Sequence, residues 1–424
     1  MYLVEQYIIH RSDPRYAVLD AASFASKNLY NAALYEMRQA FIHHGKRLYY
    51  TAMDKRMQPH ETYRALPAKV AQQVLRQLEQ CWTGYFEACQ AYREDPSKFT
   101  GRPKLPKYKD KVNGRNLLVY TEQAISKRAL KEGLLHLSLL PVSFKTTRTQ
   151  IQQVRIIPRN GFYMVEVVYN QEPLQAKVNP AYYAGIDIGL NSLVALASNK
   201  PGFVPLLVNG RPVKSVNQYY NKRRAELQQQ LGRPGTTKHM QRLTNTRTRR
   251  IALYLHTASR RIIDRLVQEG IGTLVIGKND GWKQEANLGA RINQHFVQIP
   301  HARFIEMLMY KAELVGITVL LTEESYTSKA SFLDRDPLPK KNLNKKAKEL
   351  FSGKRVKRGL YRASENRFIH ADVNAAYNII RKVAPHAFVA KGVEDGGVVT
   401  PCVVHPVRIV VPLRSQRSKR SQDR

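Results

Sequence analysis

Apolar runs of strand length alternate with helical patterns in the second half of the chain, and this alternation constrains the fold more than any other feature. Residues 182–198, "YYAGIDIGLNSLVALAS", contain two such runs around a Gly turn, and "IGTLVIG" (271–277) and "VGITVLLTEE" (315–324) follow. A helical pattern lies between the last two runs, and another covers "HADVNAAYNIIRKV" (370–383). Strands that alternate with helices predict an α/β layer.

The first of these runs carries a candidate catalytic acid, Asp187. The order β-β-(β)-α-β-α-β-α matches a ribonuclease-H-like layer, whose central first strand supplies one acid. Asp187 follows Ile186 within that strand and precedes Gly189, where a phosphate backbone has room to approach. A buried Asp is costly unless it is paired or binds a ligand. The alternative is an Asp that only caps the turn at Gly189.

A second candidate acid, Asp372, begins the last helical pattern. Hydrolysis of a phosphodiester by two divalent metals needs several converging carboxylates, and Mg²⁺ prefers oxygen ligands. The alternative for Asp372 is the N-cap of the helix. Ala375 and Ala376 form a small face on which the helix can pack tightly against the sheet, and Asn374 is expected to orient an acid or the scissile phosphate.

The charge of the chain predicts a partner rich in phosphates. In 424 residues, 69 Lys and Arg against 33 Asp and Glu give a net charge of +36, which is typical of proteins that cover nucleic acid. A basic protein of the ribosomal type is the alternative. No segment approaches the roughly 20 apolar residues of a membrane span, and we expect no membrane partner.

Cysteine usage favours the reducing cytoplasm. The three cysteines, Cys81, Cys89 and Cys402, are too few for a disulfide framework or a four-cysteine zinc site. No secretory signal is visible at the N-terminus. We therefore expect a cytoplasmic, nucleoid-associated protein with no zinc.

The N-terminal half predicts a β domain interrupted by helices. Strand patterns at 1–19 and 100–178 favour a β-barrel-like domain, and helical patterns fill 20–99. The nuclease-like layer then covers 179–383, and a basic tail, in part disordered, covers 384–424.

Two basic regions are candidate nucleic-acid contacts. The loop "FTGRPKLPKYKDKVNGR" sets an aromatic ring that can stack on a base among cations. The helical region after residue 217 carries twelve Lys and Arg between Lys222 and Arg265, against two acids. The candidates, chosen from composition, are Arg102, Lys104, Lys107, Tyr108, Lys109, Arg260 and Arg261.

The motifs together resemble the TnpB (OrfB) family, RNA-guided DNA nucleases encoded by transposons and related to type V CRISPR effectors. The resemblance lies in "GIDIGLNSLVALAS", "TLVIGKNDGWKQE", "ESYTSKASFLD" and "ADVNAAYNIIRKV". It implies a RuvC nuclease domain, a wedge-like N-terminal barrel with a helical recognition insertion, and a prokaryotic insertion sequence as the source.

The activity implied by the resemblance is Mg²⁺-dependent cleavage of double-stranded DNA that matches a guide RNA and lies beside a short motif. Mn²⁺ is a possible substitute for Mg²⁺. The alternatives are an inactive RNA-guided DNA-binding protein and a transposase or accessory transposition protein.

The sequence departs from the family pattern after "YTS". Many relatives carry Cys-x-x-Cys pairs there, but this chain has Ala330 and no cysteine nearby. The resemblance therefore implies that the zinc ribbon is absent. Either nothing replaces it, or the basic loop 334–362 folds on nucleic acid.

A second departure concerns the third active-site acid. Many relatives end the second-motif strand with a glutamate, where this chain has Gly277. For family members with a glycine or a proline at this position, the resemblance implies that a glutamate about 45 residues later supplies the acid. In this chain that glutamate is Glu324. The strand "ITVLLT" ends just before Glu324 and is expected to lie beside the second-motif strand, so the Glu324 side chain could reach Asp187. Glu323 would point the other way and is kept as possible support; Asp280 and Glu285 are weaker candidates. The remaining alternative is a dead site.

Overall fold

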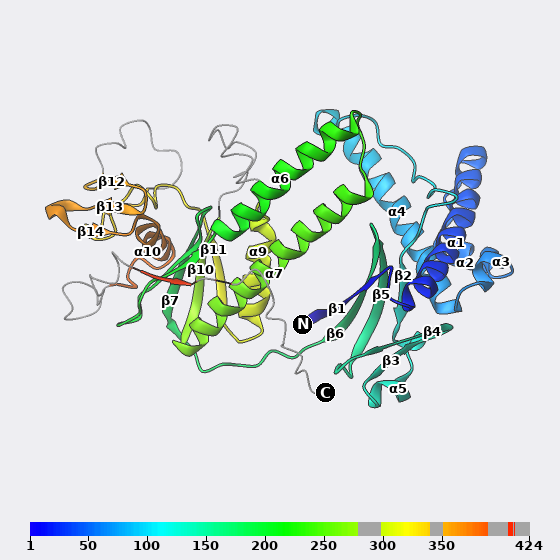
Figure 1. Cartoon of the computed structure of the whole chain (residues 1–424), viewed down its shortest axis with the longest axis horizontal. Coiled ribbons are helices and arrows are strands. Elements are labelled where there is room, and N and C mark those ends of the chain that lie inside the picture. The colour runs from blue at the N-terminus through cyan, green and yellow to red at the C-terminus, as the bar shows by residue number, and fades with distance from the viewer. Residues whose placement is uncertain (279–297, 340–350, 389–405, 410, 412–424) are drawn as a thin grey trace. The chain divides into compact units, whose positions relative to one another are not determined.

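The computed structural model describes residues 1–278, 298–339, 351–388, 406–409 and 411 (Figure 1). The chain divides into two compact units, Met1–Gln171 and Glu172–Arg424. The boundary expected at residue 178 lies earlier, because residues 172–178 belong to the second unit and their backbone bonds there. Leu174 N donates to Leu314 O at 2.8 Å, and Ala176 N donates to Val315 O at 3.1 Å.

The first unit contains an open antiparallel sheet. Its strand order is β1-β6-β5-β2, and β3 and β4 pair as a separate hairpin. The expected barrel is not confirmed: β3 and β4 pair with each other, and β1 and β2 are the edges of the four-stranded sheet. The bounds are β1 (Tyr2–His10), β2 (Leu118–Thr121), β3 (Leu134–Leu137), β4 (Leu140–Lys145), β5 (Ile151–Arg159) and β6 (Phe162–Asn170).

Two long helices of the first unit pack on each other through apolar stripes. Leu29, Ala33 and Met37 of α1 are buried in the same core as Val74 and Trp82 of α4. Each stripe repeats at helical spacing, so one face of each helix is removed from water. The helices of this unit are α1 (Arg15–His44), α2 (Tyr50–Met57), α3 (Glu61–Arg64), α4 (Ala68–Glu94) and α5 (Lys127–Lys131), with short 3₁₀ turns at Pro96–Lys98 and Glu122–Ala124.

The second unit is built on one mixed sheet with the strand order β11-β10-β7-β8-β9-β15. β10 and β11 run parallel to β7, whereas β8 is antiparallel to it. The predicted ribonuclease-H-like order is thus present, with β7 in the middle of the sheet. The strands are β7 (Asn179–Ile188), β8 (Ser192–Ser198), β9 (Leu206–Asn209), β10 (Ile271–Gly277), β11 (Thr318–Thr322) and β15 (Val407–Ile409).

Strand β15 corrects the expectation for the C-terminal tail. Val407–Ile409 pairs in parallel with Leu206–Val208 of β9, so part of the basic tail completes the sheet. Residues 389–405, 410 and 412–424 of this tail lie outside the described part of the chain, so the expectation of partial disorder stays a prediction.

Helices cover both faces of this sheet. Ala184, Ile186 and Ile188 of β7 share a core with α7 and α9, and Ala195 and Ala197 of β8 share another with α10. Since side chains alternate along a strand, Gly185 and Asp187 face α10. Figure 1 shows α6 and α7 as a long helical hairpin. The helices are α6 (Arg211–Leu231), α7 (Lys238–Gln268), α9 (His301–Glu313) and α10 (Ala371–Val383).

A small three-stranded sheet follows β11. It consists of β12 (Lys354–Lys357), β13 (Leu360–Arg362) and β14 (Phe368–Ile369), with a 3₁₀ turn at Ser364–Asn366. The expectation that 334–362 forms only an irregular loop is therefore wrong at 354–362, and 340–350 lies outside the described residues. None of the described helices is long and apolar enough to cross a membrane.

Candidate active site

Asp187 lies near the carboxyl end of the central strand β7, in register with Ala195 of β8. Its side chain is partly accessible and lines a cavity of ≈ 270 Å³. Burial raises the pKa of Asp187 well above its usual range, and the negative charges of Glu324 and Asp372 raise it further; Arg355 partly opposes them. The carboxyl therefore lies in a field that favours a positive ion beside it.

Asp372 lies in the first turn of α10 but does not cap the helix. The N-cap is His370, whose Nδ1 accepts a hydrogen bond from Asp372 N at 3.3 Å. Burial lowers the pKa of His370, so its imidazole stays neutral and able to accept. The Asp372 carboxylate remains available to the site, where Arg355 Nη2 donates to Oδ1 at 3.3 Å.

Glu324 occupies the space beside Gly277. A Cβ added to Gly277 would lie 2.6 Å from Glu324 Cγ and 2.8 Å from Ile379 Cδ1, closer than real side chains approach. β11 pairs with β10 up to Thr322 opposite Gly277, and Glu324 follows two residues later. Burial raises the pKa of Glu324 to about 7, an effect that Lys382 opposes and Glu323 supports.

Asp187 of β7 lies close enough to Glu324, which follows β11, and to Asp372, in the first turn of α10, for the charges of both to raise its pKa. Small residues of α10 permit a close approach to the sheet: Ala376 shares a buried core with Ala195 and Ala197 of β8, and Ala375 is buried as well. A Cβ at Gly185 would lie 2.7 Å from Ile380 Cγ1, which shows how closely α10 approaches β7.

The two supporting candidates have other partners. Glu323 forms an ion pair with Lys382 and accepts from Ser325 N at 3.0 Å. Asn374 is fully buried; its Oδ1 accepts from Phe332 N at 2.8 Å and its Nδ2 donates to Ala330 O at 2.8 Å. The expectation that Asn374 orients an acid or the phosphate is wrong, since its amide is used to hold the backbone at 330–332. The weaker candidates Asp280 and Glu285 lie outside the described residues.

Arginines form the rest of the cavity wall. Arg211, Arg355, Arg358 and Arg408 line it together with Asp187 and Asp372. Arg355 and Arg358 belong to the basic stretch expected to be irregular, and Arg408 belongs to the basic tail, so no sequence pattern marked these residues or Arg211 as part of a site. The two carboxylates alone would repel the negative charge of a phosphodiester. Arginines in the same cavity wall can neutralise that charge.

A larger cavity of ≈ 720 Å³ shares part of this wall. Its lining combines apolar side chains with cations and includes no acid. Arg358, Gly359, His370 and Arg408 line both cavities. The other lining residues are Leu207, Lys357, Leu360, Arg367, Phe368 and Pro406.

The loop candidates for nucleic-acid contact differ in exposure. Arg102, Lys104 and Lys107 are exposed, and Tyr108 is exposed beneath the guanidinium of Arg38, 5.1 Å from its ring centre. Lys109 is turned inward. Its ammonium lies 4.7 Å from the ring centre of Tyr30, its backbone N and O both bond Asn31 at 2.9 Å, and burial lowers its pKa. The expectation that Lys109 contacts nucleic acid is therefore not supported by its placement.

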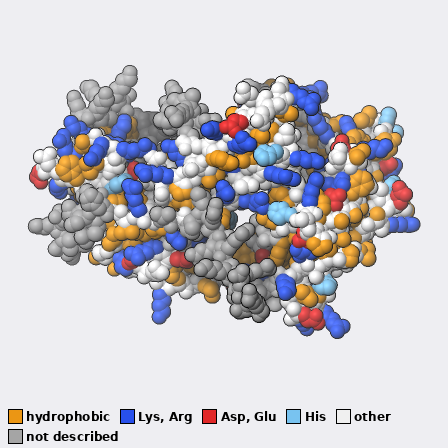
Figure 2. All heavy atoms as spheres, viewed as in Figure 1, with side chains coloured by type: hydrophobic (Ala, Val, Ile, Leu, Met, Phe, Trp, Pro, Cys, Tyr) orange, Lys and Arg blue, Asp and Glu red, His pale blue; other side chains and the backbone are white. Residues whose placement is uncertain are grey.

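Arg260 and Arg261 are exposed on α7. Arg260 Nε lies 3.1 Å from Asp264 Oδ1 in an ion pair that leaves both side chains largely in solvent. On the face shown in Figure 2, Lys and Arg side chains are far more frequent than acidic ones.

The donor set fits a hard divalent cation. Carboxylates are the ligands that Mg²⁺ prefers. Burial is the main cause of the raised pKa values of Asp187 and Glu324, so a cation beside them would favour their ionised forms. Within the described part of the chain, no three His, Cys, Asp or Glu side chains yet form a group compact enough to hold a metal ion. Arg355 takes a place on Asp372 for which a metal ion would compete.

The mixed sheet has the strand order of a ribonuclease-H-like layer, with Asp187 near the end of its central strand β7 and Glu324 just after its edge strand β11. Comparison with known families gives two matches. Residues 165–283 match OrfB_IS605, described as a probable transposase, and residues 301–379 match the Cas12f1-like TNB domain. Over these residues, the two matches support a TnpB-like protein.

Three solved structures align with most of the chain but at low sequence identity and with TM-scores below 0.5. A cryo-EM Cas12f1–sgRNA–target DNA complex has 15% identity and a TM-score of 0.49, covering 85% of this chain and 82% of that chain. A CRISPR-Cas12f ternary complex has 15% identity and a TM-score of 0.36, covering 85% and 80%. The mini-RNA-guided endonuclease CRISPR-Cas_phi3 has 9% identity and a TM-score of 0.37, covering 90% and 92%. No curated protein matches the chain.

Proposed function

We propose that the chain is an RNA-guided, Mg²⁺-dependent DNA endonuclease of an insertion-sequence element. The observation that carries this proposal is the placement of Glu324 in the space of the side chain that Gly277 lacks, beside Asp187 and Asp372. Burying a carboxylate such as Glu324 costs stability. A functional nuclease site would offset this cost, whereas an inactive site would not.

Asp187, Glu324 and Asp372 would hold the metal ions. When bound, divalent ions activate water and stabilise the leaving 3′ oxygen. Their charge would also remove the electrostatic cost that now raises the pKa of Asp187. Arg355 and Arg358 are placed to bind the phosphodiester and orient it against the carboxylates.

The partners are a guide RNA and double-stranded target DNA. A net charge of +36 suits a protein that holds a structured RNA and a heteroduplex. The guide would read sequence by base pairing, while the first unit would read a short motif beside the target. In this assignment residues 1–19 and 100–178 act as the wedge-like part, and 20–99 act as the recognition insertion.

The decisive experiment measures single-turnover cleavage of a matched duplex by protein purified with its RNA. Wild type should cut only with Mg²⁺ or Mn²⁺, and D187A, E324A and D372A should each lose cleavage while they still bind the duplex. Cleavage of the matched duplex by E324A at the wild-type rate, with D187A inactive, would show that Glu324 is not part of the site.

A second candidate is an RNA-guided DNA-binding protein without nuclease activity. The ion pair between Arg355 and Asp372 favours it, because a guanidinium already occupies one carboxylate. This candidate predicts guide-dependent binding with no cleavage in any divalent metal. A transposase would instead join strands, and a strand-joining assay on the same substrates separates the two chemistries.

A further inference from the structure

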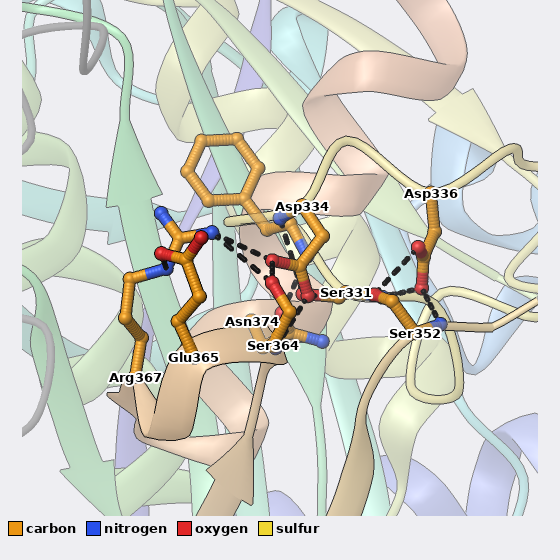
Figure 3. Close-up of polar contacts among 9 residues, drawn as sticks. Ser331, Asp334, Asp336, Ser352, Ser364, Glu365, Arg367 and Asn374 are labelled. Carbon is orange, nitrogen blue, oxygen red and sulfur yellow. Dashed lines mark hydrogen bonds and ion pairs between the residues drawn. The ribbon is translucent and has the colours of Figure 1, made fainter.

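Four side chains near the small sheet converge on one centre (Figure 3). They form two pairs with the spacing i and i+3, Ser331 with Asp334 and Ser364 with Arg367, and we name this group the polar clamp. Asp334 Oδ1 accepts from Arg367 Nη2 at 2.7 Å and from the hydroxyl of Ser364. Asp334 Oδ2 accepts from Ser364 N at 3.0 Å, and Asp334 N donates to Ser331 Oγ at 3.2 Å.

Asp336 and Ser352 extend the polar clamp to a third segment. Ser352 Oγ donates to Asp334 Oδ2 at 2.6 Å and lies 2.8 Å from Asp336 Oδ1. Asp336 Oδ2 accepts from Ser331 N at 2.7 Å and from Ser352 N at 3.1 Å. Hydrogen bonds thus join three stretches of chain that are distant in sequence.

Asp334 is a buried charge with a full set of partners. Its side chain is only 7% exposed, and it forms an ion pair with Arg367. Burial alone would raise the pKa of Asp334, but hydrogen bonds from Ser352 and Ser364 outweigh it and hold the pKa well below its usual range. A buried, ionised carboxylate with several donors is an anchor whose loss is costly.

We propose that the polar clamp takes the place of a structural metal and holds the basic hairpin β12–β13 against the active-site cavity. Structural zinc sites are commonly built from two ligand pairs of closely spaced residues on separate segments. Here a carboxylate and two hydroxyls occupy such positions, and the guanidinium of Arg367 supplies the positive charge.

The polar clamp reaches the active site through the strands that it ties together. Arg367 precedes β14, β14 pairs with β13, and β13 pairs with β12. Arg355 of β12 bonds Asp372, and Arg358 in the following turn lines both cavities. Asp334 and Arg367 are therefore positioning residues for these arginines, a role that rests on the proposed nuclease function.

The first test needs neither RNA nor DNA. Hydrogen exchange is measured on wild type, D334A, R367A and the double variant. We expect amide exchange within 351–369 to rise by about tenfold or more in the variants without Asp334, because the Ser364 amide and the Ser352 hydroxyl lose their acceptor on Asp334. R367A should raise it through the loss of the ion pair that holds Asp334. Protection of β7 and β8 should stay unchanged, which shows that the unit still folds.

The matched control is K200A. The ion pair of Lys200 with Glu269 has side-chain exposures of 28% and 19% and lies in the same unit. Ala184 pairs with Ser198 and Asp187 with Ala195, so Lys200 follows the end of β8 that points away from the site. K200A should leave exchange within 351–369 at the wild-type rate.

The second test separates positioning from binding. In the RNA-bound protein we expect D334A and R367A to slow single-turnover cleavage by about 10- to 100-fold, as misplaced groups commonly do. Target affinity should change by no more than about threefold. The double variant should be no slower than D334A, because the two residues act as one unit. R367K keeps the charge but loses the forked donor, and should recover part of the rate.

The third test asks whether the four positions surround one metal-sized centre. The variant S331C/D334C/S364C/R367C should bind one Co²⁺ with the absorption of a tetrathiolate site, whereas wild type should not. With Zn²⁺ its exchange within 351–369 should return toward the wild-type rate.

If D334A and R367A leave amide hydrogen exchange within 351–369 unchanged, the polar clamp does not hold this segment, whatever the nuclease activity of the variants. Absence of Co²⁺ uptake by the four-cysteine variant would overturn the equivalence to a metal site. Increased exchange with full cleavage would overturn the link to the arginines. An inactive wild type with increased exchange in the variants would instead refute the proposed function and leave the clamp supported.

Discussion

Glu324 fills the space that a side chain at Gly277 would need, with an added Cβ only 2.6 Å from Glu324 Cγ. A glutamate at position 277 or at position 324 could therefore place its carboxylate in the same space, but not both at once. E324A should slow cleavage by about a thousandfold, because metal-bound charge stabilisation supplies several kcal/mol. The variant G277E/E324A should recover part of the rate, since the removal of Glu324 opens the space and only the end of Ile379 must shift.

The control for this exchange is G277E alone, in which both glutamates compete for the same space. It should be less stable than wild type and slower than the double variant. Equal rates for E324A and G277E/E324A would show that the strand end cannot supply the acid.

The raised pKa of Glu324 makes stability depend on pH when metal is absent. Its folded pKa is about 7, above the ordinary 4.5, so the folded state binds more protons than the unfolded state between these values and wild type loses stability as pH rises through this window. E324Q should therefore be more stable than wild type at pH 8 by up to about 3 kcal/mol. The difference should vanish near pH 4.

Thermal unfolding in EDTA across this pH range measures the effect. Addition of Mg²⁺ should stabilise wild type and leave E324Q nearly unchanged, because the cation compensates the carboxylates directly. A pH-independent difference between the two proteins would contradict the assignment of the effect to Glu324.

The strand order explains why the position of this acid could be predicted from sequence. Long apolar runs identified β7, β10 and β11, and right-handed crossovers place parallel neighbours side by side. Gly277, which ends β10 and has no side chain, and Glu324, which follows β11, therefore lie at the same edge of the sheet. For Asp372 the sequence predicted a catalytic acid but left the helix N-cap open as an alternative, and in the structure the N-cap is His370.

Elements without apolar periodicity could not be predicted. All four residues of β12 are exposed, so its strand character comes from pairing with β13 and not from a pattern in its own sequence. The polar clamp joins Ser331 to Ser364 across distant sequence, which no local propensity reports. β15 is only three residues long and depends on the free edge of β9.

Arg355 competes with metal for Asp372 through an ion pair of 3.3 Å. Since the Arg355 side chain is 49% exposed, the pair is weak, and R355A should lower the Mg²⁺ concentration for half-maximal binding by only about two- to fivefold. The maximal cleavage rate should fall if Arg355 also orients the phosphate. Metal titrations of both binding and cleavage separate these effects.

K354A is the matched control, because Lys354 lies on the same strand but lines neither cavity. It should leave both the metal requirement and the rate near those of wild type. A rate increase in R355A would mean that the guanidinium only blocks the site.

A zinc-selective chelator should leave cleavage unchanged. The chain has three cysteines in total, Cys81, Cys89 and Cys402, and hydrogen bonds and an ion pair join the side chains of the polar clamp. EDTA should abolish cleavage and Mg²⁺ should restore it, because the carboxylates bind a hard cation. Inhibition by the zinc-selective chelator that zinc reverses would reveal a structural zinc site.

Lys107 and Lys109 should behave differently although they are two residues apart. Lys107 is exposed, so K107A should weaken nucleic-acid binding and lower the slope of log K against log salt by about 1. Lys109 contacts Tyr30, and burial lowers its pKa. K109M should keep the wild-type salt slope, and it should unfold at an equal or higher temperature because it removes a desolvated charge. A reduced slope in K109M would place its ammonium on a phosphate and reverse this assignment.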